Sequence, residues 1–290
     1  MLMSPLIHAV RPREWVKNVF VLAALVFTKR IFEPDDLLQG TLALVCFCLI
    51  SGAAYLFNDL RDRENDRQHP LKRHRPIASG ALRISVAAIA AILLALLALI
   101  GGFYVHPHFG IVLLIYAVLN IAYTLYLKHI VILDVMIIAA GFLLRAIGGA
   151  VAIQVAISSW FILCTMLLAL FLGFAKRRHE LALLEGDAST HRRILAEYSP
   201  QFLDQIIAIV TAGALVSYAL YTMSSEVIEK LGTKYLNLTI PFVIYGMLRY
   251  LYLIYKKDGG GNPTSTVLGD FPLLIACALW LLTLGVILYV

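Results

Sequence analysis

The chain of 290 residues is 61% hydrophobic and only 14% charged, with a mean hydropathy of +0.84. Soluble globular domains are about 45–50% apolar and about 25% charged, so this composition excludes a water-soluble enzyme, a disordered chain and a nucleic-acid-binding domain. The net charge of +6 therefore has to be interpreted by its position relative to a membrane. All four cysteines lie in apolar runs, which predicts buried packing and no disulfide or zinc site: Cys46, Cys48, Cys164 and Cys277.

Apolar runs long enough to cross a bilayer recur along the whole chain. A transmembrane helix needs about 20 predominantly apolar residues. The runs fall at 15–31, 38–58, 84–105, 109–127, 130–152, 157–175, 202–224, 236–255 and 271–290. They predict an all-α, polytopic membrane protein whose nine transmembrane helices form one bundle with a polar cytoplasmic cap. No linker rich in proline, glycine and serine divides the chain, so residues 1–290 are expected to form a single integral-membrane domain.

The basic residues are distributed unevenly between the two ends of these runs. If the N-terminus is cytoplasmic, the outer segments hold only Lys29, Arg30, Lys230 and Lys234. The cytoplasmic segments then hold eighteen basic residues: Arg11, Arg13, Lys17, Arg61, Arg63, Arg67, Lys72, Arg73, Arg75, Arg83, Lys128, Lys176, Arg177, Arg178, Arg192, Arg193, Lys256 and Lys257. Because cytoplasmic loops carry an excess of Lys and Arg, we expect the N-terminus inside, the C-terminus outside and the polar chemistry on the cytoplasmic side.

The loop between the second and third runs carries a regular set of oxygen ligands. Asn58, Asp62 and Asp66 recur every four residues. On a helix, each step of four residues is offset by about 40° and rises about 6 Å, so the three side chains share one face. Mg²⁺ prefers hard oxygen ligands and is commonly held by one or two carboxylates plus substrate phosphates. The spacing predicts that these three residues bind Mg²⁺ and act catalytically on a diphosphate.

Basic residues follow in the same loop. Lys72 and Arg75, with Arg73 between them, are expected to bind the remaining phosphate oxygens of such a substrate. The alternative is a solvated, charge-rich loop that only helps to set the membrane topology.

A second polar segment, residues 176–187, follows the sixth run. Lys176, Glu180 and Asp187 share a helical face. One interpretation is an ion pair that caps an interfacial helix. The other is a functional site, which we favour because a diphosphate bound with Mg²⁺ needs ligands from more than one helix.

Two basic residues lie within the apolar runs themselves. Intramembrane cations are costly unless they are paired or face a polar cavity. We expect Arg145 to face such a cavity, whereas Arg249 is close enough to a helix end to extend its charge to the interface. Asp270, just before the last run, is interpreted either as a helix N-cap or as a site residue.

Several of these motifs together resemble the UbiA superfamily of intramembrane prenyltransferases over nearly the whole chain. The matching features are the run of spans, residues 58–62 (NDLRD) with Asp66, residues 75–80 (RPIASG), and residues 126–128 (YLK) followed by Asp134. The resemblance implies an all-α bundle whose cytoplasmic cap binds a diphosphate through Mg²⁺. It also implies a central cavity that opens sideways to lipid.

One motif departs from the family pattern. Typical members carry a second DxxxD motif after the sixth span, whereas residues 176–181 read KRRHEL. In this the chain is similar to the branch that contains decaprenyl-phosphate phosphoribosyltransferase, as it is at residues 198–199, 202–204 and 248–250. That branch implies phosphoribosyl pyrophosphate as donor, a polyprenyl phosphate as acceptor and a product for cell-wall arabinan synthesis. The donor carries a second phosphate at C5, which suits added cations in place of an aspartate pair.

The resemblance implies a role for each candidate residue. Asn58, Asp62 and Asp66 would hold Mg²⁺ on the leaving diphosphate, with Glu180 as a further ligand or a ribose partner. The expected substrate-binding residues are Lys17, Lys72, Arg75, Lys128, Asp134, Arg145, Lys176, Arg177, Glu180 and Arg249. Among them, Lys17 would steer the lipid phosphate, and Asp134 would either bind ribose or orient Lys128.

Two other classes of function stay open. A conventional UbiA prenyltransferase would join a prenyl diphosphate to an aromatic or glycerol-phosphate acceptor, and the missing second aspartate motif disfavours it. A transporter or non-catalytic lipid binder predicts inverted repeats, which the sequence does not display convincingly. We expect a protein of a bacterial or archaeal plasma membrane that contacts lipid but no nucleic acid, and the sequence leaves its oligomeric state open.

Overall fold

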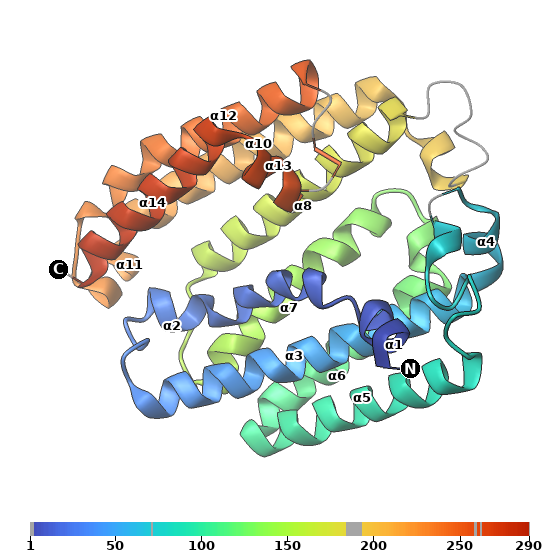
Figure 1. Ribbon diagram of the computed structural model, residues 1–290. Coiled ribbons are helices and arrows are strands. Elements are labelled where there is room, and N and C mark those ends of the chain that lie inside the picture. The colour runs from blue at the N-terminus through green and yellow to red at the C-terminus, as the bar shows by residue number, and fades with distance from the viewer. Residues whose placement is uncertain (1–2, 71, 184–192, 258–259, 262, 290) are drawn as a thin grey trace. The chain divides into compact units, whose positions relative to one another are not determined.

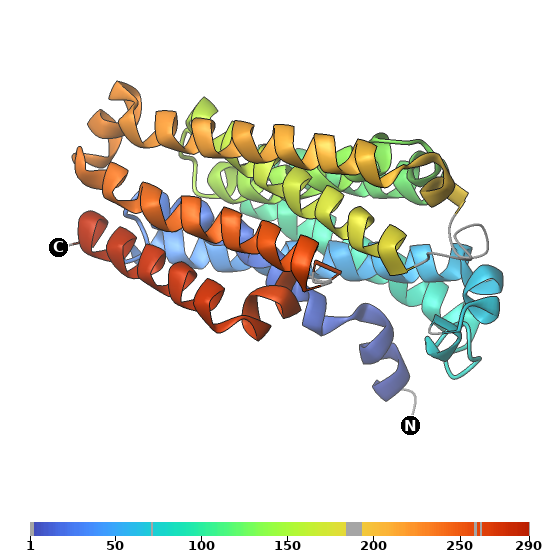
Figure 2. The ribbon, with the colours of Figure 1, turned by 90° about the horizontal axis from the view of Figure 1, so that it is seen from above.

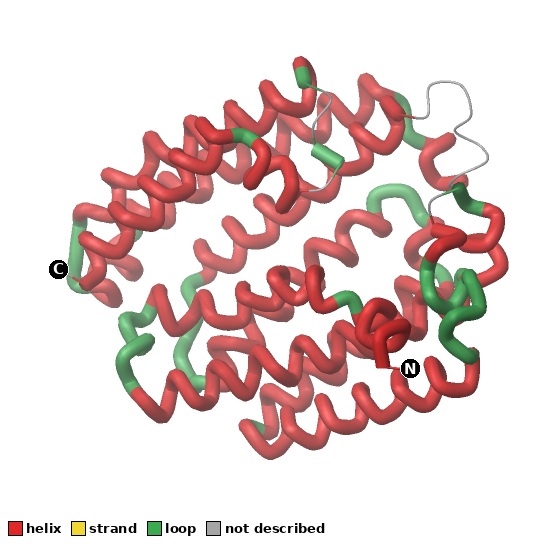
Figure 3. Tube along the Cα trace, in the orientation of Figure 1, coloured by secondary structure: helices red, strands yellow, loops and turns green. Residues whose placement is uncertain are grey.

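The computed structural model describes residues 3–70, 72–183, 193–257, 260–261 and 263–289. Within these residues every regular element is a helix, and loops and turns join the helices (Figure 3). The all-α prediction is therefore confirmed. The chain divides into two compact units: unit 1 comprises Met1–Ile130 and Gly141–Ala156, and unit 2 comprises Val131–Ala140 and Ile157–Val290. The expectation of a single domain stays a prediction.

Unit 1 is built around the long helix α3. Its elements are α1 (Met3–Val10), η1 (Pro12–Leu22), α2 (Ala23–Phe27), α3 (Pro34–Arg61), α4 (Arg63–Gln68), η2 (Lys72–His74), α5 (Ile84–Val105), α6 (Pro107–Leu125) and η3 (Leu127–His129). Helices α3, α5 and α6 lie side by side (Figures 1 and 2). Aromatic rings lie between α3 and α6: the centroid of Phe47 lies 5.5 Å from that of Tyr116, and both rings belong to one buried cluster with Phe109.

Helix α7 (Leu133–Ala152) contributes its first part to unit 2 and its second part to unit 1. In unit 1 its backbone lies close to η1 at Gly149, where an added Cβ would lie 1.7 Å from the carbonyl oxygen of Val21. At Gly148 an added Cβ would lie 2.6 Å from the ring of Phe47. Only glycine leaves room for this approach, so the two glycines allow α7 to pack closely against η1 and α3.

Unit 2 contains two pairs of packed helices. Its elements after α7 are α8 (Ser159–Leu183), η4 (Arg193–Glu197), α10 (Pro200–Met223), α11 (Ser225–Leu231), η5 (Tyr235–Thr239), α12 (Ile240–Lys256), α13 (Pro263–Gly269) and α14 (Phe271–Tyr289). Helix α8 packs against α10, and α12 packs against α14 (Figure 1). A polar network joins α14 to α10 and η5, because Trp280 donates to the Tyr218 hydroxyl at 2.8 Å and that hydroxyl lies 2.7 Å from the hydroxyl of Thr239.

Eight helices of the described residues are long and apolar enough to cross a membrane. They correspond to eight of the nine apolar runs: 34–61, 84–105, 107–125, 133–152, 159–182, 200–223, 235–256 and 271–289.

The remaining run, 15–31, does not form one long α-helix. It contains η1, a 3₁₀ helix that begins at Pro12 after Arg11 in the left-handed region, and then the short α2. Lys29, also at positive φ, follows the end of α2. The expected count of nine membrane-spanning helices is therefore not reproduced in the described residues, because a 3₁₀ helix and a five-residue α-helix take the place of one long α-helix in this run. Polar side chains of the run also pack into unit 1. Asn18, for example, is buried and donates to Ser51 at 3.1 Å.

Candidate active site

The predicted metal ligands lie where α3 passes into α4. Asn58 is in the last turn of α3, Asp62 joins the two helices and Asp66 is in α4. The backbone N–H of Asp62 donates to the carbonyl of Asn58 at 2.9 Å, and that of Asp66 donates to the carbonyl of Asp62 at 2.8 Å. Because these bonds join residues four apart, the backbone keeps helical spacing through the junction. That the three side chains share one face stays a prediction.

Lys128 joins this group from η3. Its Nζ lies 2.6 and 2.7 Å from the two carboxylate oxygens of Asp62, and the lysine is buried. The structure therefore brings together two candidate residues that are 66 positions apart in the chain. We call Asn58, Asp62, Asp66, Lys128 and Arg75 the aspartate cluster.

Arg75 connects the following loop to Asp66 of the motif and to its neighbour Asp59. Its Nη1 donates to Asp66 at 2.6 Å and to Asp59 at 3.1 Å. Asp59 is buried and also receives both hydrogen bonds of Arg11, at 2.7 and 2.8 Å. Sequence reasoning missed Asp59 and Arg11. Burial raises the pKa of Asp66, whereas the positive charges of Arg75 and Lys72 lower it.

Three members of the aspartate cluster carry oxygen donors that suit a divalent cation, and Lys128 and Arg75 contact the two carboxylates in this structure. Metal binding by these residues stays a prediction. Asp62 and Asp66 supply carboxylates and Asn58 an amide oxygen, which are hard ligands of the kind Mg²⁺ takes. The described residues contain no group of three or more His, Cys, Asp and Glu side chains arranged to hold a metal ion by themselves. Two carboxylates with phosphate oxygens of a substrate match the usual way in which proteins hold Mg²⁺ with a diphosphate.

A second set of site residues lies in unit 2, and we call Asp134, Arg177, Glu180 and Tyr198 the Arg177 cluster. Arg177 Nε donates to Asp134 Oδ2 at 2.7 Å, and its Nη1 donates to Glu180 Oε2 at 2.5 Å. Tyr198 donates to Asp134 Oδ1 at 2.8 Å, so both carboxylate oxygens of Asp134 are engaged. Lys176 lies 3.8 Å from Glu180, which is the ion pair expected from their spacing.

The Arg177 cluster clarifies the expected role of Asp134. The side chain of Asp134 is 0% exposed, which argues against direct contact with a ribose and for a role in holding Arg177. Asp187, which shares the expected face with Glu180, lies outside the described residues. Tyr198 is the member that residue types alone did not single out.

Arg145 is buried in the part of α7 that belongs to unit 1. Its nitrogens donate to Asn18 at 2.8 Å, to the carbonyl of Gly141 at 2.8 Å and to the hydroxyl of Tyr116 at 2.7 Å. Its guanidinium carbon also lies 4.9 Å from the centroid of the Tyr116 ring and 5.4 Å from that of Phe142. Neutral acceptors and aromatic faces thus provide the polar surroundings that an intramembrane cation requires. Its contact with substrate stays a prediction.

Two other expected cations pair with nearby acids. Arg249 forms two hydrogen bonds to Asp270, at 3.0 and 2.8 Å. Asp270 in turn accepts from the backbone N–H of Leu273 at 2.9 Å, so it caps α14, and the hydrogen bond from Arg249 lowers its pKa. Of the two interpretations of Asp270, a helix N-cap or a site residue, these contacts support the N-cap. Lys17 pairs with Glu14 within η1.

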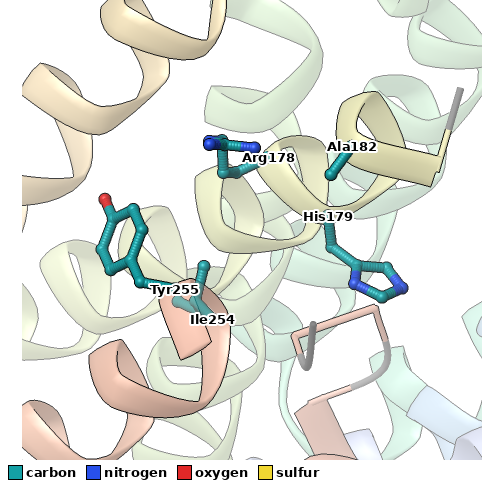
Figure 4. Close-up of a pocket in the computed structure, with 5 residues that line it drawn as sticks. All are labelled: Arg178, His179, Ala182, Ile254 and Tyr255. Atoms are coloured by element: carbon teal, nitrogen blue, oxygen red, sulfur yellow. The ribbon is translucent and has the colours of Figure 1, made fainter. Parts of the chain in front are cut away.

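A small cavity lies where the ends of α8 and α12 meet in unit 2 (Figure 4). Its volume is about 70 Å³, and its lining residues are Arg178, His179, Ala182, Ile254 and Tyr255. Arg178 donates to Asp204 at 2.8 Å, so its charge is already paired. None of the residues predicted for the site lines this cavity.

Comparison with known proteins identifies the family. The model of the UbiA prenyltransferase family matches residues 18–269. The chain is 37% identical to a decaprenyl-phosphate phosphoribosyltransferase of Mycolicibacterium smegmatis, over 99% of this chain and 93% of that protein. It is 34% identical to a decaprenyl-phosphate phosphoribosyltransferase of Corynebacterium glutamicum, over 98% of this chain and 87% of that protein.

Solved structures share the fold. A UbiA homolog from Archaeoglobus fulgidus bound to GPP and Mg²⁺ matches with a TM-score of 0.76 and 18% identity, covering 99% of this chain and 100% of that chain. A structure of digeranylgeranylglyceryl phosphate synthase matches with a TM-score of 0.68 and 15% identity, covering 98% of each chain. The family model and the two relatives show that the chain belongs to the UbiA prenyltransferase family. It is an integral membrane protein with a UbiA fold.

Proposed function

We propose that this protein transfers the 5-phosphoribosyl group from phosphoribosyl pyrophosphate to a polyprenyl phosphate of the decaprenyl type and releases diphosphate. The observation that carries the proposal is the identity of 37% and 34% to two decaprenyl-phosphate phosphoribosyltransferases over nearly the whole chain. The basic segment of α8 supports it, because the conventional prenyltransferases that the chain resembles carry two aspartates where this chain has Lys176, Arg177 and Arg178.

The reaction requires little acid–base chemistry from the protein. An oxygen of the lipid phosphate attacks C1 of the ribose, the bond from C1 to the diphosphate oxygen breaks, and diphosphate leaves with the electron pair. The lipid phosphate is already anionic at neutral pH, so no side chain has to remove a proton from the nucleophile. The main tasks of the protein are to position the two substrates and to stabilise the negative charge on the leaving group.

The aspartate cluster would bind the diphosphate end of the donor. Asn58, Asp62 and Asp66 would hold Mg²⁺, which when bound neutralises charge on the diphosphate. The ammonium group of Lys128 donates to the carboxylate of Asp62, and it would also contact diphosphate oxygens. Arg75, which is tied to Asp66, would contact the same oxygens together with Lys72.

The Arg177 cluster would bind the ribose 5-phosphate portion of the donor. Arg177 and Lys176 supply positive charge for the phosphate at C5. Glu180, whose side chain is 27% exposed, is the acid of this cluster that can reach a ribose hydroxyl. Asp134 would act through Arg177, because its own oxygens are engaged.

The lipid acceptor would approach from the bilayer. Lys17, near the start of η1, is proposed to steer the lipid phosphate, and Arg145 and Arg249 are proposed as intramembrane contacts of this substrate. The excess of basic residues in the segments assigned to the cytoplasm supports a cytoplasmic site with the N-terminus inside. A bacterial or archaeal plasma membrane would be its location.

One assay tests the proposed function against its rivals. The purified protein in detergent receives phosphoribosyl pyrophosphate, Mg²⁺ and decaprenyl phosphate in one tube, and a prenyl diphosphate with 4-hydroxybenzoate in another. We expect a phosphoribosylated lipid in the first tube alone. A product only in the second tube would identify a conventional prenyltransferase, and no product in either tube would favour a non-catalytic lipid binder.

A further inference from the structure

A chain of hydrogen bonds starts at the backbone just before α7 and ends at Glu180. The N–H of Ile132 donates to the hydroxyl oxygen of Tyr198 at 2.7 Å, and that hydroxyl donates to Asp134 at 2.8 Å. Asp134 accepts from Arg177 at 2.7 Å, and Arg177 donates to Glu180. Each side chain in this series is thus hydrogen-bonded to the preceding group. All of these residues belong to unit 2.

The first link of this chain rests on an unusual backbone conformation. Ile132 has a φ of 70°, in the left-handed region that β-branched residues rarely occupy. Such a conformation persists only where the surrounding structure holds it, and it is most often found near functional sites. At this position it directs the N–H of Ile132 at the Tyr198 hydroxyl.

The middle members of this series of hydrogen bonds are buried, and the Glu180 end is partly exposed. Asp134 is fully buried and Arg177 is only 3% exposed, whereas the side chain of Glu180 is 27% exposed. Tyr198 is buried as well, and its ring stacks on Phe202 with 6.2 Å between the centroids. The inner members therefore cannot contact a substrate without rearrangement, but Glu180 can.

We propose that Tyr198 is a positioning residue for donor binding, which acts by holding Asp134 and through it the Arg177–Glu180 pair. This inference rests on the proposed function, because it assigns the donor to the Arg177 cluster. Tyr198 contacts no substrate in this scheme. Its hydroxyl is the one group in the chain of bonds that both accepts from the backbone and donates to the buried acid.

The protonation of Tyr198 is consistent with this role. Burial raises the pKa of its hydroxyl, and the negative charge of Asp134 raises it further. The hydroxyl therefore keeps its proton at physiological pH and remains a donor to Asp134.

The test is the variant Tyr198→Phe in the full-length protein, with Tyr235→Phe as the matched control. Tyr235 is an exposed tyrosine of the same unit. For each protein we would measure the KM for phosphoribosyl pyrophosphate, the KM for decaprenyl phosphate, the melting temperature, and the affinity for phosphoribosyl pyrophosphate with Mg²⁺ by calorimetry. Because Tyr198 acts on the donor only through Asp134 and Arg177, we expect part of the loss of a hydrogen bond to a charged group to reach donor binding, as a rise of about five- to tenfold in donor KM and donor Kd for Tyr198→Phe. The KM for the lipid should stay within about twofold, and Tyr235→Phe should behave as the wild type.

Two outcomes would overturn the inference. An unchanged donor KM in Tyr198→Phe would mean that the hydroxyl positions nothing that the donor contacts. A parallel loss of donor affinity, lipid affinity and melting temperature would mean that Tyr198 only supports the fold.

A second variant covers the case in which Tyr198→Phe does not fold. Asp134→Asn alters the next member of the chain of bonds and should give the same donor-specific rise in KM, whereas an unchanged donor KM would again refute the role. A wild-type protein that neither binds nor uses phosphoribosyl pyrophosphate would overturn the proposed function and this inference together. A wild type that binds it, beside an unaffected Tyr198→Phe, would overturn the inference alone.

Discussion

Replacement of Arg75 by alanine is expected to destabilise unit 1 through the acids it leaves behind. Arg75 Nη1 lies 2.6 Å from Asp66 and 3.1 Å from Asp59, and the side chains of these acids are only 5% and 2% exposed. Removal of one partner of a fully buried ion pair costs about 3–5 kcal/mol. Arg75 is 26% exposed and Arg11 still neutralises Asp59, so we expect roughly half of that, about 2 kcal/mol.

Chemical denaturation in detergent, without added metal, measures this loss. Two further variants isolate its cause. Arg75→Lys keeps the charge and should lose less, and Asp66→Asn removes the acid that becomes unpaired. In the double variant Arg75→Ala/Asp66→Asn the loss should be smaller than the sum of the single losses by about 1 kcal/mol or more. Strictly additive losses would refute the reasoning, because they would mean that Arg75 and Asp66 do not interact.

The effect of pH gives an independent check on the same variant. Burial already raises the pKa of Asp66, and loss of Arg75 raises it further. A carboxyl whose pKa is raised in the folded state destabilises that state when the pH rises through the folded pKa. The deficit of Arg75→Ala relative to the wild type should therefore shrink as the pH is lowered from about 8 toward 5. A deficit that grows on acidification would contradict this assignment.

Three further predictions concern other parts of the chain. Asp62→Asn should lower kcat by about 100-fold or more and raise the Mg²⁺ concentration required, measured as activity against Mg²⁺, and full activity would remove Asp62 from the metal site. Gly149→Ala should cost about 3 kcal/mol or more in denaturation, because the Cβ meets a backbone carbonyl, whereas Gly285→Ala, with open space around it, should cost nothing. Asp270→Ala should lower the free energy of unfolding by about 1 kcal/mol, because it removes the cap of α14. Arg249 lowers the pKa of Asp270, so the wild type should lose the contribution of the cap only as the pH falls through this lowered pKa. Equal stability of the two proteins at neutral pH would contradict the cap.

The sequence predicts those features that depend on residues close together in the chain. Composition and run length predict nine spans, and eight of them are long apolar helices in the described part of the chain, because hydrophobic length is a local property. The stagger of Asn58, Asp62 and Asp66 also follows from spacing alone, since a helix fixes the relation between residues four apart. The pair of Lys176 and Glu180 was predictable for the same reason.

The partners of these residues were not predictable, because they come from distant parts of the chain. Lys128 is 66 positions from Asp62, and Arg11 is 48 positions from Asp59. Hydrophobic periodicity carries no information about such pairs. An acid directly beside Asn58 was the available signal for Asp59, whose carboxylate shares Arg75 Nη1 with that of Asp66.

The conformation of the first apolar run shows a second limit. Asn18 is buried, donates to Ser51 and accepts from Arg145, which is 127 positions away. The 3₁₀ conformation of η1 accompanies these contacts, and hydropathy alone could not distinguish it from an α-helix. A polar amide inside an apolar run was the available signal.

The most direct test of the central claim follows the two phosphate groups of the donor separately. Phosphoribosyl pyrophosphate labelled with one isotope in the 5-phosphate and another in the diphosphate is incubated with the purified protein, Mg²⁺ and decaprenyl phosphate. A phosphoribosyltransferase predicts that the 5-phosphate label enters the lipid fraction while the diphosphate label is released as free diphosphate, in equal amounts. Diphosphate label in the lipid, or release of diphosphate without labelled lipid, would contradict the proposed transfer.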